Sequence, residues 1–126
     1  MNQGLPPDNW DTHVRQLGGG ILQSRPWAVF QQALGRELVW DSNDDWCWLA
    51  SVRRSHGLSY LMCGYGPVAE DDAAMRTAMS SIVRAAQRLH LDFVRIEPQA
   101  HARTRIHLVL ERLLMPTLPI RGSLTL

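Results

Sequence analysis

The stretch GGGILQSRPWAVFQQALG (residues 18–35) contains the start and stop signals of a short helix. Its three leading glycines would end any helix that precedes them, because glycine accepts the backbone angles that stop a helix. Ser24 is a favourable N-cap, and Pro26 stands in the first turn, where a missing backbone N–H costs little. Gly35 is a natural stop. Large apolar side chains recur between these signals at helical spacing, at Trp27, Phe30 and Leu34.

Composition limits the class of protein. The chain has 126 residues, of which 45% are hydrophobic, and a net charge of +1, which fits one globular domain with a core of its own. The charge balance gives no signature of a nucleic-acid binder or a membrane-surface protein. The first residues do not resemble a secretory signal, and no window approaches 18 consecutive apolar residues. These features predict a cytoplasmic protein without a transmembrane segment.

Strands are predicted on the C-terminal side of the opening helix, and residues 1–17 are interpreted as an N-terminal lead-in. Alternating and β-branched or aromatic residues predict strands at residues 38–40, 46–53 and 58–63. Polar turns at residues 41–45 and 55–57 join them into an antiparallel meander. The segment DFVRIEP (residues 92–98) predicts a further strand, and SLTL (residues 123–126) another.

Two more helices complete the expected order. Residues 70–90 have an apolar face at helical spacing, formed by Met75, Ala78, Met79, Ile82, Val83, Ala86 and Leu89. Residues 103–114 form a second amphipathic segment. The order of elements predicts an α+β fold in which helices flank a mostly antiparallel sheet.

The residues alone show no evident catalytic set. The P-loop and dinucleotide fingerprints are absent, and so is the Gly-x-Ser-x-Gly pattern of serine hydrolases. Cys47 and Cys63 are expected to be buried thiols, and whether they face each other depends on a one-residue choice of strand register. No metal site is expected, because metal-ligand spacing is missing at His56, His90, His101 and His107.

Two segments could still bind an anion. Residues 64–67 are the candidate for an acyl-CoA phosphate turn, but Pro67 stands where a donor N–H would be needed, so a tight exit from a strand is favoured. The end of the chain is basic, which fits either a solvated helix face or a site for an anionic ligand. Its basic residues are His101, Arg103, Arg105, His107 and Arg112.

Three segments in order resemble the FemABX family, the peptidoglycan-bridge aminoacyltransferases. ILQSRPWAVFQQALG is similar to the family's Leu-Gln-Ser-x-x-Trp-x-x-Phe-Lys-x-x-x-Gly pattern. SYLMCGYGPV (residues 59–68) is similar to its Tyr-Leu-Tyr-x-Pro-Arg-Gly-Pro-Val segment. FVRIEPQ (residues 93–99) is similar to its Phe-x-Arg-Ile-Asp/Glu-Pro segment. The resemblance extends over about residues 18–99.

The resemblance implies a GNAT-like fold and a specific activity. Family members have two GNAT-like domains, and residues 18–126 resemble the first. They transfer an amino acid from aminoacyl-tRNA to a side-chain amine of a peptidoglycan precursor, lipid-linked or UDP-linked, at the inner face of the membrane. They use no acyl-CoA, and no other cofactor is expected. On this basis the lining of the precursor cleft is expected at Trp27, Gln31, Tyr65 and Arg95, with the catalytic residues unknown.

The chain departs from the family pattern at charged positions. Gln31 replaces a lysine that can meet the precursor's phosphates, and Gly64 and Tyr65 replace a Pro-Arg pair. The second domain is not within the 126 residues, so a second GNAT-like half or self-association is expected. Two alternatives therefore remain. One is a truncated, non-catalytic binding module, and the other is a free-standing CoA-dependent N-acetyltransferase.

Overall fold

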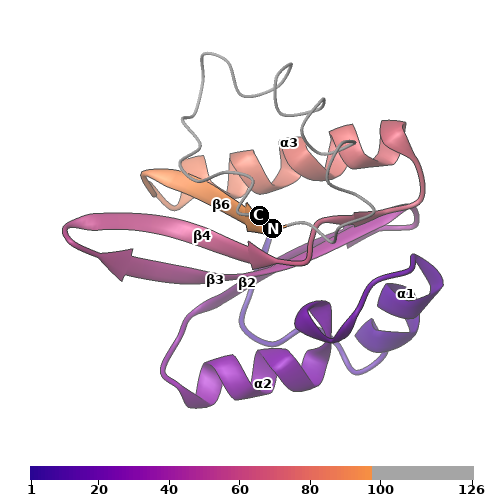
Figure 1. Cartoon of the computed structure of the whole chain (residues 1–126), viewed down its shortest axis with the longest axis horizontal. Helices are drawn as coiled ribbons and strands as arrows, with labels where there is room; N and C mark the ends of the chain where they lie inside the picture. Colours follow the sequence, from indigo (N-terminus) through magenta and orange to yellow (C-terminus); the bar gives the residue numbers. More distant parts are fainter. Residues whose placement is uncertain (98–126) are drawn as a thin grey trace.

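A mixed β-sheet lies between helices on its two faces (Figure 1). The computed structural model describes residues 1–97. The strand order is β1-β2-β3-β4-β6, and the short β5 pairs with β3 beside β4. β6 runs parallel to β4, and the other pairs are antiparallel. The strands are β1 (Asn2–Gln3), β2 (Leu38–Asn43), β3 (Trp46–Ser55), β4 (Leu58–Gly64), β5 (Val68–Ala69) and β6 (Phe93–Glu97).

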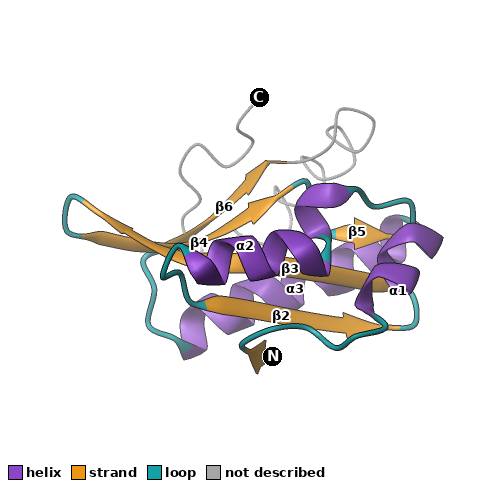
Figure 2. Ribbon diagram, turned by 90° about the horizontal axis from the view of Figure 1, so that it is seen from below, coloured by secondary structure: helices purple, strands orange, loops and turns teal. Residues whose placement is uncertain are grey.

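Helix α3 (Asp72–Arg88) covers one face of the sheet, and α1 (Trp10–Gln16) and α2 (Arg25–Ala33) cover the other. Seen from below, α1 and α2 lie in front of the strands and α3 lies behind them (Figure 2). A single 3₁₀ turn, η1 (Ile21–Gln23), leads into α2. The described residues therefore confirm the predicted α+β class.

The central strand β3 is buried on both faces and contributes to two cores. Trp46, Trp48, Ala50 and Val52 belong to the cluster that contains α3. The alternate residues Cys47 and Leu49 belong to the cluster beneath α1 and α2, with Trp10, Val14 and Ala28. This alternation follows from the two-residue period of a strand. Residues 1–17 take part in the second core, since Trp10 and Val14 are buried, and β1 extends the sheet beside β2.

The start and stop signals of α2 act as predicted. The backbone N–H of Trp27 donates to Ser24 Oγ at 3.3 Å, which is the expected N-cap hydrogen bond. Gly35 directly follows the C-cap residue, with a φ of +83°. The end of α2 therefore uses the left-handed conformation that glycine adopts without strain.

Phe30 and Leu34 point outward, which the helical spacing alone did not indicate. Ala28 and Gln31 are buried against the sheet, whereas Phe30 and Leu34 are about half exposed. Ala28 is fully buried, and a side chain of this size lets the helix axis lie close to the strands.

The observed boundaries correct several predicted ones. β2 continues to Asn43, so the turn before β3 is shorter than the predicted residues 41–45. Asn43 Oδ1 closes that turn by accepting the backbone N–H groups of Asp45 and Trp46, at 2.8 and 3.0 Å. The long helix begins after its N-cap Asp71 and not at residue 70. The helix and strand predicted at residues 103–114 and 123–126 lie outside the described residues.

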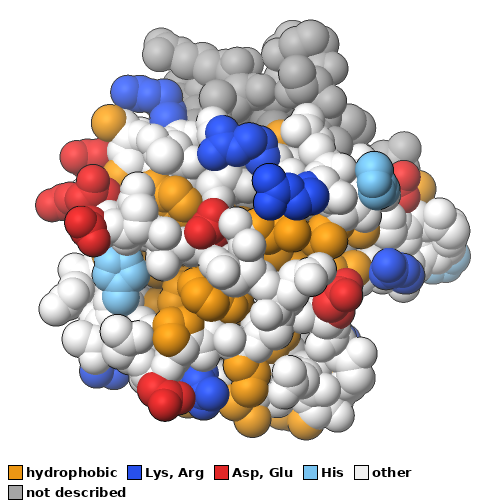
Figure 3. Space-filling model, turned by 180° about the vertical axis from the view of Figure 1, so that it is seen from behind, with side chains coloured by type: hydrophobic (Ala, Val, Ile, Leu, Met, Phe, Trp, Pro, Cys, Tyr) orange, Lys and Arg blue, Asp and Glu red, His pale blue; other side chains and the backbone are white. Residues whose placement is uncertain are grey.

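Acidic side chains gather at one end of the molecule (red, at the left of Figure 3). Here the turn between β2 and β3 meets the segment before α3, and the backbone N–H of Glu70 donates to the Asp45 carbonyl at 2.9 Å. Side-chain hydrogen bonding with Asp45, and the charge of that carboxylate, raise the pKa of Glu70.

Candidate functional site

Gln23 joins η1 to the centre of the sheet. Its side chain is fully buried. Its Oε1 accepts the backbone N–H of Leu49 at 2.8 Å, and its Nε2 donates to the Leu49 and Gly64 carbonyls at 3.0 and 2.7 Å. One amide therefore satisfies polar backbone groups on both β3 and β4.

Gly66 packs directly against the same amide. A Cβ atom on Gly66 would lie 2.7 Å from both Cδ and Oε1 of Gln23, closer than real Cβ atoms approach other atoms. The ILQS segment and the GYGP segment, far apart in the sequence, therefore meet at this contact. It fixes η1, and with it the start of α2, above the sheet.

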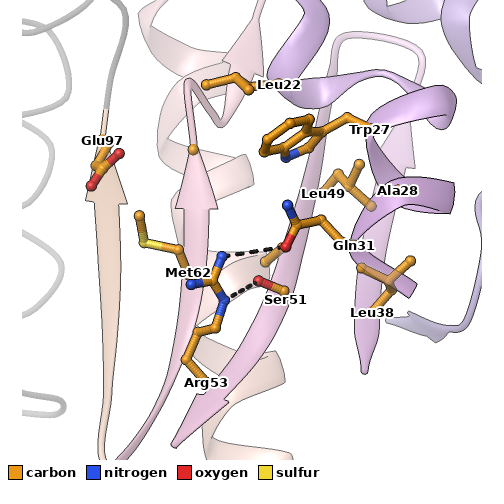
Figure 4. A pocket seen from close by; sticks show the side chains of 12 residues that line it. Leu22, Trp27, Ala28, Gln31, Leu38, Leu49, Ser51, Arg53, Met62 and Glu97 are labelled. Atoms are coloured by element: carbon orange, nitrogen blue, oxygen red, sulfur yellow. Dashed lines mark hydrogen bonds between the residues drawn. The ribbon is translucent and has the colours of Figure 1, made fainter. Parts of the chain in front are cut away.

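A small cavity of about 90 Å³ lies between α2 and the sheet (Figure 4). It has room for about three water molecules. Its walls combine an apolar part and a polar part. The apolar side chains are Leu22, Trp27, Ala28, Leu38, Leu49, Ala50 and Met62, and the polar ones are Gln31, Ser51, Arg53 and Glu97.

Arg53 supplies positive charge to this cavity. Its Nε donates to Ser51 Oγ at 2.8 Å, and a terminal nitrogen donates to Gln31 Oε1 at 3.4 Å (dashed in Figure 4). Arg36 donates to the same Gln31 oxygen at 2.5 Å. Two guanidinium groups thus share one neutral amide oxygen, and these hydrogen bonds neutralise neither charge.

The charge around Arg53 is unbalanced. Burial and then the positive charge of Arg36 lower the pKa of the Arg53 guanidinium, and Arg95 adds to this effect. Tyr60 and Glu97 act in the opposite direction. Arg36 and Arg95 would attract an anion that enters the cavity, and the Glu97 carboxylate that lines it would repel one.

The structure brings some of the four expected site residues together. Trp27 and Gln31 line the cavity. Arg95 lies on the same face of the sheet, because it pairs with the lining residue Met62 across β4 and β6. The Arg95 Nε also lies 3.9 Å from an Oε1 of Glu97, which lines the cavity.

Tyr65 does not line the cavity. It directly follows the lining residue Gly64, with a φ of +56°, and its side chain is 44% exposed. Its backbone N–H donates to the Glu97 carbonyl at 2.6 Å, which ties the end of β4 to the end of β6. The Tyr65 backbone therefore holds the ends of β4 and β6 together next to the cavity.

Arg36 and Arg53 are the charged groups that sequence reasoning missed. Neither belongs to a recognised motif, and each approaches Gln31 from a different part of the chain. The available signal was Gln31, which stands where the family pattern has a lysine. Without that lysine, another residue has to supply the positive charge. Within residues 1–97, no three potential metal ligands form a group.

The two cysteines are buried and lie in different clusters, Cys63 in that of α3 and Cys47 in that of α1 and α2. Burial raises the pKa of each thiol to about 12. Native protein at pH 8 should therefore react with a thiol reagent such as DTNB only as fast as it unfolds, and urea-denatured protein should react at once. Rapid labelling of either thiol in the native state would contradict the described packing.

The same thiols predict a loss of stability in alkali. In the unfolded chain they ionise near the ordinary pKa of 9.0, while in the folded chain they stay protonated up to about pH 12. The unfolded state thus binds fewer protons between these values, and the free energy of unfolding should fall as the pH rises through this window. Replacing both cysteines with alanine should flatten this part of the pH profile.

Solved structures, but no sequence comparison, show which known proteins share this fold. No model of a protein family matches the sequence, and no curated protein sequence does. A sheet of this topology flanked by helices is GNAT-like, and among solved structures FemX shares it with a TM-score of 0.66 and 16% identity. The likeness covers 90% of this chain and 31% of FemX. The chain therefore has a FemABX-like fold and spans about a third of the length of FemX.

The protein TTHA1254 of Thermus thermophilus has the same fold. A point mutant of it matches with a TM-score of 0.60 and 14% identity, over 96% of this chain and 91% of the other. The wild type matches with a TM-score of 0.59 and 15% identity, over 88% and 85%. A chain of similar length can therefore consist almost entirely of this fold.

Proposed function

We propose that this chain is the first GNAT-like domain of an aminoacyltransferase of the peptidoglycan-bridge type. The reaction would transfer an amino acid from aminoacyl-tRNA to a side-chain amine of a cell-wall precursor. Two observations support the proposal: the fold shared with FemX, and the convergence on one pocket of the three sequence segments that resemble the family. Gln23, Gly64 and Glu97, one from each segment, all lie in or beside this pocket.

The observation that carries the proposal is the source of positive charge at Gln31. The resemblance implies a lysine at this position, for the precursor's phosphates, and here the side chain is a neutral amide. Arg53 from β3 and Arg36 from beyond the end of α2 both donate to that amide. The charge absent from α2 is thus supplied by two neighbouring segments, and guanidinium groups suit phosphate and carboxylate oxygens.

The proposed reaction needs no covalent enzyme intermediate and no acyl-CoA. The precursor amine attacks the ester carbonyl carbon of the charged tRNA, forming an amide. The ester C–O bond breaks, and the tRNA ribose oxygen leaves with the proton that the amine gives up. Positioning of the two substrates and neutralisation of the precursor's charge would supply most of the acceleration. Arg53, Gln31 and Trp27 would contact one small anionic group of the precursor, with Arg95 beside them, because a cavity of about 90 Å³ has no room for the rest of it.

The proposal places the protein in the cytoplasm, where charged tRNA is available, with its precursor at the inner face of the membrane. Within residues 1–97, no helix has the length and apolar character needed to span a bilayer. The partners proposed are the precursor, aminoacyl-tRNA and a second GNAT-like half. Because the chain spans 31% of FemX, a non-catalytic precursor-binding module is the second candidate. Transfer of a labelled amino acid from charged tRNA by this chain would exclude it.

Arg53→Met is expected to weaken binding of a UDP-linked muropeptide at least about tenfold, because a charge-assisted contact is lost. Isothermal titration calorimetry measures this directly. The melting temperature should also fall somewhat, because the buried Ser51 loses its hydrogen bond to Arg53, so binding is compared at a temperature at which both proteins are folded. The matched control is Arg84→Met, an exposed arginine of α3 on the opposite side of the sheet. Equal affinities of Arg53→Met and the wild type would refute an anion site at Arg53.

A further inference from the structure

An apolar surface runs along the outer side of α2. Of the five large hydrophobic side chains that are exposed within residues 1–97, four lie on η1, α2 and its C-cap. Their exposed fractions are 72% for Ile21, 44% for Val29, 51% for Phe30 and 54% for Leu34. We call these four residues the α2 outer face. The cavity lies on the other side of α2, although Phe30 of this face packs against the cavity-lining Trp27 with a ring-centroid distance of 5.3 Å.

The size of this face fits the centre of a protein interface. Four side chains at these exposures present roughly 400 Å² of apolar surface, about the size of the largest patch on an ordinary monomer. A stable interface buries about 800 Å² per partner, with an apolar centre and a polar rim. The α2 outer face would supply that centre, and the surrounding polar surface would supply the rim.

The charge pattern restricts the partner. Each exposed position of α2 and its C-cap is uncharged: Pro26, Val29, Phe30, Gln32, Ala33 and Leu34. The arginines at either end are engaged within the chain. Arg25 donates to the Pro6 carbonyl at 2.9 Å and lies 3.5 Å from Asp8, while Arg36 donates to Gln31. The α2 outer face itself therefore carries no charged side chain with which to bind a nucleic acid or an anionic lipid.

We propose that the α2 outer face binds a second copy of this chain, with α2 packed antiparallel to its counterpart. A two-fold interface sets the same patch against itself, and an uncharged patch does so without repulsion. Val29 is the central residue of α2, so the two Val29 side chains lie beside each other across the axis. The proposal is independent of the proposed function, because the cavity lies on the other side of the helix.

The test uses charge at Val29. In sedimentation-velocity experiments, the wild type is expected to dimerise at concentrations up to about 100 μM, in the range of a moderate homodimer. Val29→Glu and Val29→Lys should each raise the dimer dissociation constant at least tenfold, because like charges would meet at the axis. An equimolar mixture of the two variants should restore the dimer. Gln87→Glu, at an exposed position of α3, is the control and should leave dimerisation unchanged.

Three results would overturn the proposal. The first is a wild type that stays monomeric throughout this range. The second is a dimer that survives Val29→Glu with unchanged affinity, since it would use another face. The third is a mixture of the two folded variants, checked by circular dichroism, that remains monomeric, since the two Val29 side chains would then not be neighbours.

Discussion

Replacing Gln23 with methionine is expected to lower the free energy of unfolding by roughly 3–6 kcal/mol, the largest effect of any single substitution considered. Methionine keeps the length of the side chain but can neither donate nor accept as the amide does. The Leu49 N–H and the Leu49 carbonyl would lose their Gln23 partner in a buried place, and the Gly64 carbonyl would lose it in a partly buried one. Each buried group left unsatisfied costs about 1–3 kcal/mol.

Urea denaturation followed by tryptophan fluorescence measures this loss. Gln32→Met is the matched control, because Gln32 is an exposed glutamine on the neighbouring helix α2. The control should change the free energy of unfolding by less than about 0.5 kcal/mol. A Gln23→Met protein within about 1 kcal/mol of the wild type would mean that the amide does not hold η1 to the strands, contrary to the described hydrogen bonds.

The second large effect is expected at Gly66. Gly66→Ala should destabilise the fold by about 1–3 kcal/mol, because overpacking forces buried neighbours to move. The new Cβ would lie 2.7 Å from Cδ of Gln23, and the amide cannot move away without breaking its own hydrogen bonds. At Gly64, two residues away, a Cβ would meet only Leu22 side-chain atoms, at 3.8 and 4.0 Å. Gly64→Ala is therefore the control and should be tolerated.

A double-mutant cycle tests whether Gly66 acts through Gln23. In a Gln23→Ala background the obstructing amide is gone, so Gly66→Ala should cost much less than it does in the wild type. Strictly additive losses would show that the cost of the alanine at position 66 comes from another contact.

Local signals predicted most of the fold. The N-cap at Ser24, the stop at Gly35 and the apolar face of α3 were predicted correctly, because each depends on neighbours within a few residues. β1, η1 and β5 span only two or three residues each, too few to show a periodicity. The outward direction of Phe30 and Leu34 depends on how closely α2 approaches the sheet, which Ala28 sets and no helical spacing reveals.

The candidate site was predictable in part. The resemblance indicated Trp27 and Gln31, and both line the cavity. Arg53 was not predicted as a site residue because it is 22 residues from Gln31 in the chain. Only the pairing of β3 in the sheet brings the two side chains together. Gln23 belongs to the quoted motif, yet a glutamine before a helix gives no local sign that it is fully buried. Its role depends on β3 and β4, which come later in the sequence.

An NMR titration of the ¹⁵N-labelled chain with a UDP-linked muropeptide precursor would show directly whether the cavity beneath α2 binds the precursor. The Trp27 indole N–H and the Gln31 side-chain amide are expected to shift together with the Arg53 Nε–H, since these groups border the same cavity. The indole N–H of Trp48, which donates to Ser81 beneath α3, should stay in place as an internal reference. A folded protein with no shifts, or with shifts confined to residues away from this cavity, would contradict the claim that the pocket beneath α2 binds the precursor.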